Sequence, residues 1–340
     1  MDMDIRYHVI KDFAFSDGTV LPSVTVAYAV LNPSATKTAL VVTCFRGRLQ
    51  NTCTFAQGAL QGHRVVVAAL FGNGESSSPS NTPGFPGATL SYEDSVSAQK
   101  DLLVNALRID CLDVVVGFSM GGQATYHWLV MYPDIVRRAV IICSSARTSG
   151  HNVQFLEGPR FALENSADYV PIAKRREDDV SPSMAANACV RGIQAFGKAY
   201  SAWLTSAEWF EQEGYRSLGF NSRTDWDSAT TGPNYSGWDP DDLLALLGTW
   251  QRGDVTKLNG GKSTTNSLHG VLSSISAPAL LMPGKTDQYF RSYVSQSEAS
   301  MIPKATLKVI PSIWGHLAGS GANPVDTQWM DEQISIFLNE

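Results

Sequence analysis

The pattern of hydrophobic and polar residues changes in character along the chain. Residues 7–15 and 24–30 alternate in polarity on either side of a Ser-Asp-Gly-Thr stretch at 16–19, which predicts an antiparallel hairpin at the edge of a sheet. Short continuous apolar runs follow, and such runs are typical of strands that are buried on both faces of a parallel sheet. They lie at residues 39–42, 65–70, 114–116, 139–142, 279–282 and 307–310.

Helical patterns separate these runs. Ser91-Tyr-Glu-Asp94 resembles a capping box and predicts a helix that begins there and ends near Leu107. A second helix is predicted over 119–131, before Pro133. Because strands and helices alternate in this way, the predicted fold class is α/β, with a mostly parallel, doubly wound sheet.

The segment 151–275 interrupts this alternation, because it contains no buried-strand run. Its patterns predict helices at 185–207 and 240–250 and polar loops such as 220–237, and it holds five of the eight tryptophans. These rings can form the core of a packed helical insertion or line a pocket under a cap, and both can hold at once. We therefore predict a core domain of residues 1–150 and 276–340 and a helical cap subdomain of residues 151–275.

Composition argues against several classes of function. The formal net charge of −6 argues against a nucleic-acid partner, because phosphate binding needs clustered Lys and Arg. Five scattered cysteines without metal-ligand spacing predict reduced thiols, a cytoplasmic location and no metal site. Neither a signal peptide nor an apolar stretch near the ~20 residues of a membrane span is visible. The glycine-rich stretch 71–80 lacks the Gly-Lys-Ser/Thr ending of a phosphate loop, so no cofactor is expected.

One motif carries chemistry. In Val114-Val-Val-Gly-Phe-Ser-Met-Gly-Gly122, a serine lies between glycines where a strand passes directly into a helix. Such a sharp turn holds the serine in strained backbone geometry and projects its hydroxyl above the sheet. The helix N-terminus beside it favours developing negative charge. A purely structural turn would seldom need serine, so we predict Ser119 as a catalytic nucleophile.

A serine nucleophile needs a base and an acid that orients the base, and in this kind of fold they follow in the order serine, acid, histidine. Asp287 and His316 each lie on a loop after one of the last two apolar runs, where ligand-contacting loops gather in open α/β sheets. His151 and His269 precede the acid, so their order is wrong. The predicted triad is Ser119, Asp287 and His316.

Two backbone amides are expected to stabilise the oxyanion. One is that of Met120, directly after the nucleophile, and the other comes from the loop at 43–47, where Phe45 is the best candidate. Arg46 is either a solvated loop residue or a guanidinium that meets an anionic group of the substrate. Trp314 is a second candidate for substrate binding.

Several spaced motifs together resemble the homoserine O-acetyltransferase family of α/β-hydrolases, and the resemblance spans nearly the whole chain. The motifs are Gly117-Phe-Ser-Met-Gly-Gly122, the stretch at 71–79, Ala146-Arg-Thr-Ser-Gly-His-Asn152 with Phe155-Leu-Glu-Gly158, and Ser312-Ile-Trp-Gly-His316. The resemblance implies the α/β-hydrolase fold with an inserted helical cap, and an acyl-transfer triad at Ser119, Asp287 and His316. A homodimer is a further expectation from the resemblance.

The cap departs from the pattern of the acetyltransferases in this family. They carry an Arg-Tyr-Gln-Gly stretch that helps to form the amino-acid site, whereas this cap offers Arg191-Gly-Ile-Gln-Ala-Phe-Gly-Lys198 and Trp250-Gln-Arg-Gly253. The chain therefore resembles a hydrolase-like side branch of the family. Family membership of this kind supports the fold and the triad, and says little about the substrate.

The leading hypothesis is a serine hydrolase that cleaves an ester or thioester of a small to medium, partly apolar acyl compound through an acyl-enzyme. Two other enzymatic hypotheses use the same triad. One is an acyl-CoA-dependent O-acyltransferase like homoserine O-acetyltransferase, and the other is an enzyme that cleaves carbon–carbon bonds or cyclises compounds of secondary metabolism. A non-catalytic ligand-binding protein is the alternative outside enzymes, and the complete triad argues against it.

Overall fold

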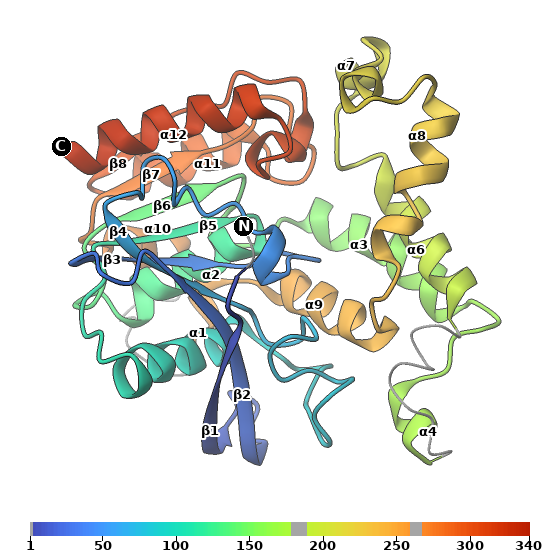
Figure 1. Cartoon of the computed structure of the whole chain (residues 1–340), viewed down its shortest axis with the longest axis horizontal. Helices are drawn as coiled ribbons and strands as arrows, with labels where there is room; N and C mark the ends of the chain where they lie inside the picture. Colours follow the sequence, from blue (N-terminus) through green and yellow to red (C-terminus); the bar gives the residue numbers. More distant parts are fainter. Residues whose placement is uncertain (1–2, 178–188, 259–266) are drawn as a thin grey trace.

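The described residues form an eight-stranded sheet (Figure 1). The computed structural model describes residues 3–177, 189–258 and 267–340. The strand order is β1-β2-β4-β3-β5-β6-β7-β8, where β2 pairs antiparallel with both β1 and β4 and every other pair is parallel. The strands are β1 (Arg6–Ala14), β2 (Val20–Leu31), β3 (Lys37–Val42), β4 (His63–Ala68), β5 (Val114–Phe118), β6 (Ala139–Ile142), β7 (Ala279–Met282) and β8 (Ala305–Leu307). The predicted fold class, α/β with a mostly parallel sheet, is confirmed.

The strands agree with the hydrophobic pattern except at the end of the chain. The alternating segments form the hairpin of β1 and β2, in which Phe13 lies opposite Leu21. The apolar run at 307–310 predicts the last strand, but β8 begins two residues earlier and ends at Leu307, while Ile310 forms an isolated bridge to Gly284. An edge strand is only partly buried, so its sequence does not need the continuous apolar run that identifies a central strand.

Alternate residues of the central strands face two separate hydrophobic layers. In β3, Leu40 and Val42 belong to one layer, and Ala39 and Val41 belong to the other. Helices α1, α2 and α11 contribute to the first layer, and α12 contributes to the second. These helices are α1 (Tyr92–Asp101), α2 (Met120–Met131), α11 (Ser292–Met301) and α12 (Pro324–Asn339). Burial on both faces explains why these strands are continuous apolar runs in the sequence.

Helix α1 begins at the predicted capping box. The Ser91 hydroxyl accepts a hydrogen bond from the Asp94 amide, and the Asp94 carboxylate accepts one from the Ser91 amide at 2.8 Å. These bonds satisfy two backbone donors that the first turn of a helix leaves free. The helix continues as a π-helical turn, Leu102–Ala106, and therefore ends where the pattern predicts.

Between β6 and β7 the chain forms a series of helices. They are α3 (Gly150–Glu164), α4 (Ile172–Glu177), α6 (Val190–Ser201), α7 (Ala207–Glu211), α8 (Arg223–Thr230), α9 (Pro240–Arg252) and α10 (Leu268–Ser273). Figure 1 shows α3, α4, α6, α7 and α8 to one side of the sheet, whereas α10 contacts α11 of the core. The limits of the cap subdomain, 151–275, stay a prediction.

The inserted segment differs from the sequence prediction in its polar part. The prediction of a loop at 220–237 is wrong, because α8 lies within it and buries Trp226 against Trp209 and Tyr215. The predicted helix at 240–250 corresponds to α9. The predicted helix at 185–207 corresponds to α6, which ends earlier, at Ser201, and residues 185–188 lie outside the described residues. Trp238 and Trp250 belong to the first hydrophobic layer, so the tryptophans of this segment serve as core.

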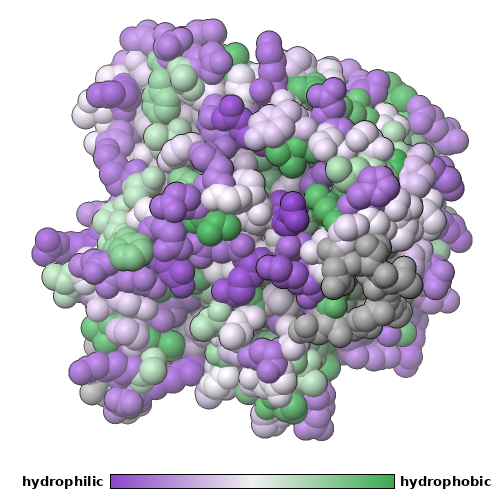
Figure 2. All heavy atoms as spheres, turned by 180° about the vertical axis from the view of Figure 1, so that it is seen from behind, coloured by the Kyte–Doolittle hydropathy of each residue, from purple (hydrophilic) through white to green (hydrophobic). Residues whose placement is uncertain are grey.

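The rear face of the molecule is mixed in polarity (Figure 2). Figure 2 shows hydrophilic side chains over most of the rear face, with apolar residues in small separate groups. No helix among the described residues has both the length and the apolar composition that crossing a membrane requires.

A buried carboxylate joins α11 to α2 and gives a prediction about stability. Glu298 is 2% exposed and accepts hydrogen bonds from the Tyr126 hydroxyl at 2.7 Å and the Ala146 amide at 2.9 Å. Burial raises the pKa of Glu298 from 4.5 to about 7. Because the pKa of Glu298 is higher in the folded protein than in the unfolded chain, the protonated side chain stabilises the fold. This contribution is complete below about pH 4.5 and is lost as the pH rises through about 7.

We therefore expect Glu298→Gln, which cannot ionise, to gain stability relative to the native protein as the pH rises. The difference in unfolding free energy between the two proteins should change by about 2–3 kcal/mol between about pH 5 and pH 8. Urea unfolding at several pH values measures it. A difference that stays constant across this range would show that Glu298 does not change its protonation on unfolding.

Candidate active site

Ser119 lies at the sharp turn between β5 and α2. Its backbone has φ 57° and ψ −122°, in a strained region for a residue other than glycine. The Ser119 amide donates to the Ile142 carbonyl at 2.9 Å, and the Ser144 hydroxyl donates to the Ser119 carbonyl at 2.7 Å. The backbone amide of Ser119 is therefore held by the end of β6, and its carbonyl is held by the loop that follows β6.

The glycines of the motif allow this turn to form. A Cβ atom on Gly117 would lie 2.0 Å from the Gly121 carbonyl oxygen, and one on Gly121 would lie 2.5 Å from the Val42 carbonyl oxygen. A Cβ on Gly122 would meet the Ser144 side chain at 2.5 Å. Gly117 and Gly121 therefore permit close packing of backbone against backbone around the serine, and Gly122 leaves room for the Ser144 side chain.

The structure brings the three predicted triad residues together. His316 Nε2 lies 2.9 Å from Ser119 Oγ, and His316 Nδ1 lies 2.8 Å from Asp287 Oδ2. Ser119 and Asp287 are each 2% exposed, and His316 is 4% exposed. Asp287 lies on the loop after β7, and His316 lies in the 3-10 helix Gly315–Gly319. A nucleophile, a base and an orienting acid in hydrogen-bonded contact form the arrangement that activates a serine.

Two backbone amides that the sequence analysis did not identify hold the aspartate. The amides of Tyr289 and Phe290 donate to Asp287 Oδ1 at 2.8 Å and 3.1 Å, which leaves Oδ2 for His316. The Tyr289 ring also lies edge-on to the His316 ring, with centroids 4.8 Å apart. An aspartate side chain commonly bonds amides two residues ahead of it, so the stretch Asp287-Gln-Tyr-Phe290 held a usable local signal.

The predicted oxyanion amides lie at the same end of the sheet as Ser119. Met120 is the first residue of α2, where an amide has no acceptor within its own helix. Phe45 lies in a turn that is closed by the Gly47 amide and the Cys44 carbonyl at 2.9 Å. Across the described ranges, the Phe45 amide makes no hydrogen bond to another protein group. Both amides are thus free to bind a ligand, and their role in oxyanion binding stays a prediction.

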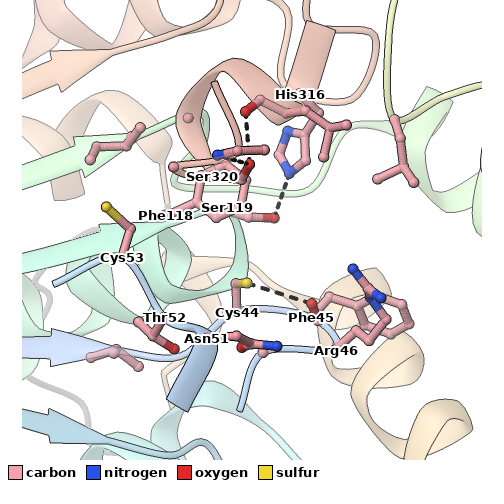
Figure 3. A pocket seen from close by; sticks show the side chains of 18 of the residues that line it. Cys44, Phe45, Arg46, Asn51, Thr52, Cys53, Phe118, Ser119, His316 and Ser320 are labelled. Atoms are coloured by element: carbon pink, nitrogen blue, oxygen red, sulfur yellow. Dashed lines mark hydrogen bonds between the residues drawn. The ribbon is translucent and has the colours of Figure 1, made fainter. Parts of the chain in front are cut away.

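A cavity of about 340 Å³ opens beside Ser119 and His316. Figure 3 shows Cys44, Phe45, Asn51 and Thr52, from the segment after β3, below Ser119 and His316, and Cys53 from the same segment to one side. Among the described residues of the inserted segment, Tyr200, Leu204 and Tyr235 form part of its wall. In the part of the chain that is described, no tryptophan of the inserted segment lines this cavity.

Two cysteines that line the cavity do not compete as nucleophiles. Burial raises the pKa of both Cys44 and Cys53 to about 11, and the charge of Arg46 offsets only part of this effect at Cys44. Both thiols therefore keep their protons near neutral pH. Since the thiolate is the nucleophilic form, neither sulfur is activated for attack.

Arg46 lines the cavity, but its guanidinium contacts the inserted segment. Its Nη1 donates to the Asn234 carbonyl at 2.8 Å, and its guanidinium carbon lies 5.3 Å from the centre of the Tyr235 ring. Trp314 is not one of the described residues that line the cavity, and its ring packs against Trp209 with centroids 6.2 Å apart. Substrate binding by Arg46 and Trp314 stays a prediction without a contact that supports it.

One group of described residues has the spacing of metal ligands, namely Cys143, Asp287 and His316, whose ligand atoms lie within 4.8 Å of one another. Asp287 and His316 already pair with each other and with other groups. Their hydrogen bonds account for both residues without a metal. The sequence-based expectation of no metal and no cofactor stays a prediction.

Comparison with known proteins identifies the class of enzyme. A family model described as the alpha/beta hydrolase fold matches residues 40–180. The chain is 33% identical to an ethyl acetate hydrolase of Pseudomonas veronii, over 97% of this chain and 93% of that protein. The chain therefore belongs to the α/β-hydrolase family and is an enzyme.

Solved structures and a second group of relatives agree with this assignment. The structure of the acetyl esterase MekB superposes with a TM-score of 0.87, at 30% identity, and covers 98% of this chain and 97% of that one. A homoserine O-acetyltransferase of Trichormus variabilis is 24% identical over 91% of this chain and 88% of that protein. The resemblance to the homoserine O-acetyltransferase family is confirmed, and the relatives include both ester hydrolases and acyltransferases.

Proposed function

We propose that this enzyme hydrolyses esters of short acyl groups, with acetyl esters of small alcohols as the substrate class, through Ser119, His316 and Asp287. The observation that carries the proposal is the contact of His316 Nε2 with Ser119 Oγ at 2.9 Å beside the 340 Å³ cavity. A cavity of this size lies at the small end of the range for small-molecule sites. Its lining is mainly aromatic and aliphatic, which suits a small, partly apolar ester.

The proposed reaction has two halves. His316 Nε2 accepts the proton of Ser119 while the serine oxygen attacks the ester carbonyl, and the amides of Phe45 and Met120 bind the oxyanion. His316 then gives the proton to the leaving alcohol, and the acyl group remains on Ser119. A water molecule, with His316 as its base, releases the acid and restores the serine. Asp287 accepts from His316 Nδ1 throughout and stabilises the imidazolium that forms in each half.

Hydrolysis is favoured over acyl transfer by the pattern of similarity. The ethyl acetate hydrolase and MekB are at least 30% identical to this chain over nearly its whole length, and each carries the name of an ester hydrolase. The acetyltransferase is less similar, at 24% identity. Acyl transfer from acyl-CoA to an alcohol uses the same acyl-enzyme and remains the second candidate. Among the described residues that line the cavity, no contact favours carbon–carbon cleavage or cyclisation. The homodimer and the cytoplasmic location stay predictions.

The test measures acid release from ethyl acetate, ethyl butyrate and ethyl octanoate, and thiol release from acetyl-CoA with and without homoserine. We expect acid release that falls as the acyl chain lengthens, and no thiol release that depends on homoserine. Thiol release that requires homoserine would make the protein a transferase and overturn the proposal. Equal rates on the three esters would contradict the short-acyl substrate class.

A further inference from the structure

A cysteine lies beside the triad and has no role in the reaction described above. Cys143 directly follows β6, and its amide donates to the Met282 carbonyl at the end of β7 at 3.0 Å. Its side chain is fully buried, and its backbone has φ 45°, a conformation that residues other than glycine seldom adopt. Strain of this kind persists only where the surrounding structure fixes it. Cys143 is therefore held in place at the edge of the site.

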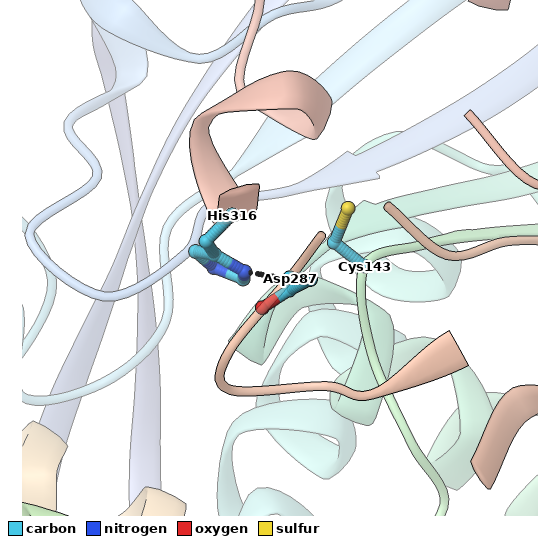
Figure 4. Close-up of side chains that lie close together, drawn as sticks. All are labelled: Cys143, Asp287 and His316. Atoms are coloured by element: carbon cyan, nitrogen blue, oxygen red, sulfur yellow. Dashed lines mark hydrogen bonds and ion pairs between the residues drawn. The ribbon is translucent and has the colours of Figure 1, made fainter. Parts of the chain in front are cut away.

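The thiol lies next to the pair of Asp287 and His316. Figure 4 shows the three side chains together, and the Cys143 sulfur lies within 4.8 Å of a carboxylate oxygen of Asp287 and a ring nitrogen of His316. Glycines of both flanking loops leave room for the sulfur. A Cβ on Gly319 would lie 2.8 Å from it, and a Cβ on Gly284 would lie 3.5 Å from it. The sulfur thus fills the space between the loop of the aspartate and the loop of the histidine.

The hydrogen bonds of Asp287 leave one acceptor position to fill. A carboxylate offers about four lone-pair sites. The amides of Tyr289 and Phe290 take two at Oδ1, and His316 Nδ1 takes one at Oδ2. The pKa of Cys143 is raised well above its usual value, mainly by burial and to a smaller extent by the charge of Asp287. The thiol therefore keeps its proton and is a donor, not a second negative charge.

We propose that Cys143 is a positioning residue, whose S–H donates to the carboxylate of Asp287 and fixes its orientation toward His316. The inference rests on the proposed function, since it assigns a role within the same reaction. Cys143 itself touches neither the substrate nor Ser119 in this scheme. Its contribution is to hold the acid so that His316 Nδ1 meets Oδ2 when the imidazolium forms.

The test compares Cys143→Ala, which removes the donor, with Cys143→Ser, which keeps a donor on a smaller atom. Cys189→Ala is the matched control, because Cys189 is also buried and its sulfur lies 3.9 Å from a carboxylate oxygen of Asp168, away from the cavity. We expect Cys143→Ala to lower kcat about five- to tenfold with KM unchanged. Cys143→Ser should restore kcat to within about twofold of the native value, as expected for a recovered hydrogen bond.

A second readout does not depend on the substrate. The rate at which an activated phosphonate labels Ser119 reports the activation of the nucleophile, and complete labelling counts the folded sites. The labelling rate should fall with Cys143→Ala and recover with Cys143→Ser, while Cys189→Ala keeps the native rate. Equal losses in the alanine and serine variants would show that the sulfur acts through packing, and would overturn the proposal. A native labelling rate in Cys143→Ala would overturn it as well.

The two proposals can fail separately. If the native protein is labelled by the phosphonate but cleaves none of the esters, the proposed function fails. The role of Cys143 is then decided by the labelling rates of the variants alone.

Discussion

Replacing Ser119 by alanine is expected to lower kcat/KM for a cleaved ester by about 10⁴-fold or more. The loss is large because the acyl-enzyme cannot form without the hydroxyl, and His316 Nε2 loses the group that it contacts at 2.9 Å. The remaining activity would come from direct attack of water on the ester, with the substrate bound in the cavity and its oxyanion bound by the amides of Phe45 and Met120. Acid release from ethyl acetate and labelling by an activated phosphonate measure the loss.

The same substitution should leave the fold nearly unchanged. Apart from the contact with His316, the bonds that hold this turn run through backbone atoms of Ser119 and survive in alanine. We expect the melting temperature to change by no more than about 1 °C, because in a chain of this length a few tenths of a kcal/mol shifts it by less than that. Activity within tenfold of the native rate, in a preparation free of other esterases, would rule out Ser119 as the nucleophile.

The parts of the site that the sequence predicts are those that local patterns determine. Three consecutive valines followed by Gly-Phe-Ser-Met-Gly determine the strand, the turn and the helix around Ser119 within one short segment. Asp287 and His316 follow from their order and from the apolar runs before them. In each case the residue follows the carboxyl end of a strand. Because these ends lie on the same side of the sheet, the three residues can meet although they are far apart in the sequence.

Features that depend on distant contacts were not predictable in this way. Helix α8 lies in a segment with a polar sequence, and it is stabilised where Trp226 packs on Trp209. The guanidinium of Arg46 binds Asn234, which lies 188 residues further along the chain. The loop after β6 holds no carboxylate near its start, so a search for the triad acid passes over Cys143, although its sulfur lies beside Asp287.

A methyl group on Gly117 is expected to destabilise the fold severely. Its Cβ would lie 2.0 Å from the carbonyl oxygen of Gly121 and 2.5 Å from the amide nitrogen of Gly122. Both atoms belong to the first turn of α2, so they cannot move without displacing the Ser119 turn from β6. We expect Gly117→Ala to lose at least about 4 kcal/mol of unfolding free energy, the range of severe backbone clashes, or to yield no folded protein.

Gly150→Ala provides the matched control. Gly150 is the first residue of α3, and a Cβ there would meet no atom within 4 Å. Alanine in a helix is favoured over glycine by up to about 1 kcal/mol, so this variant should equal or exceed the native stability. Urea unfolding followed by tryptophan fluorescence compares the three proteins. If Gly117→Ala unfolded at the native urea concentration, α2 could move away from β5 at little cost, and the strained geometry of Ser119 would not depend on this glycine.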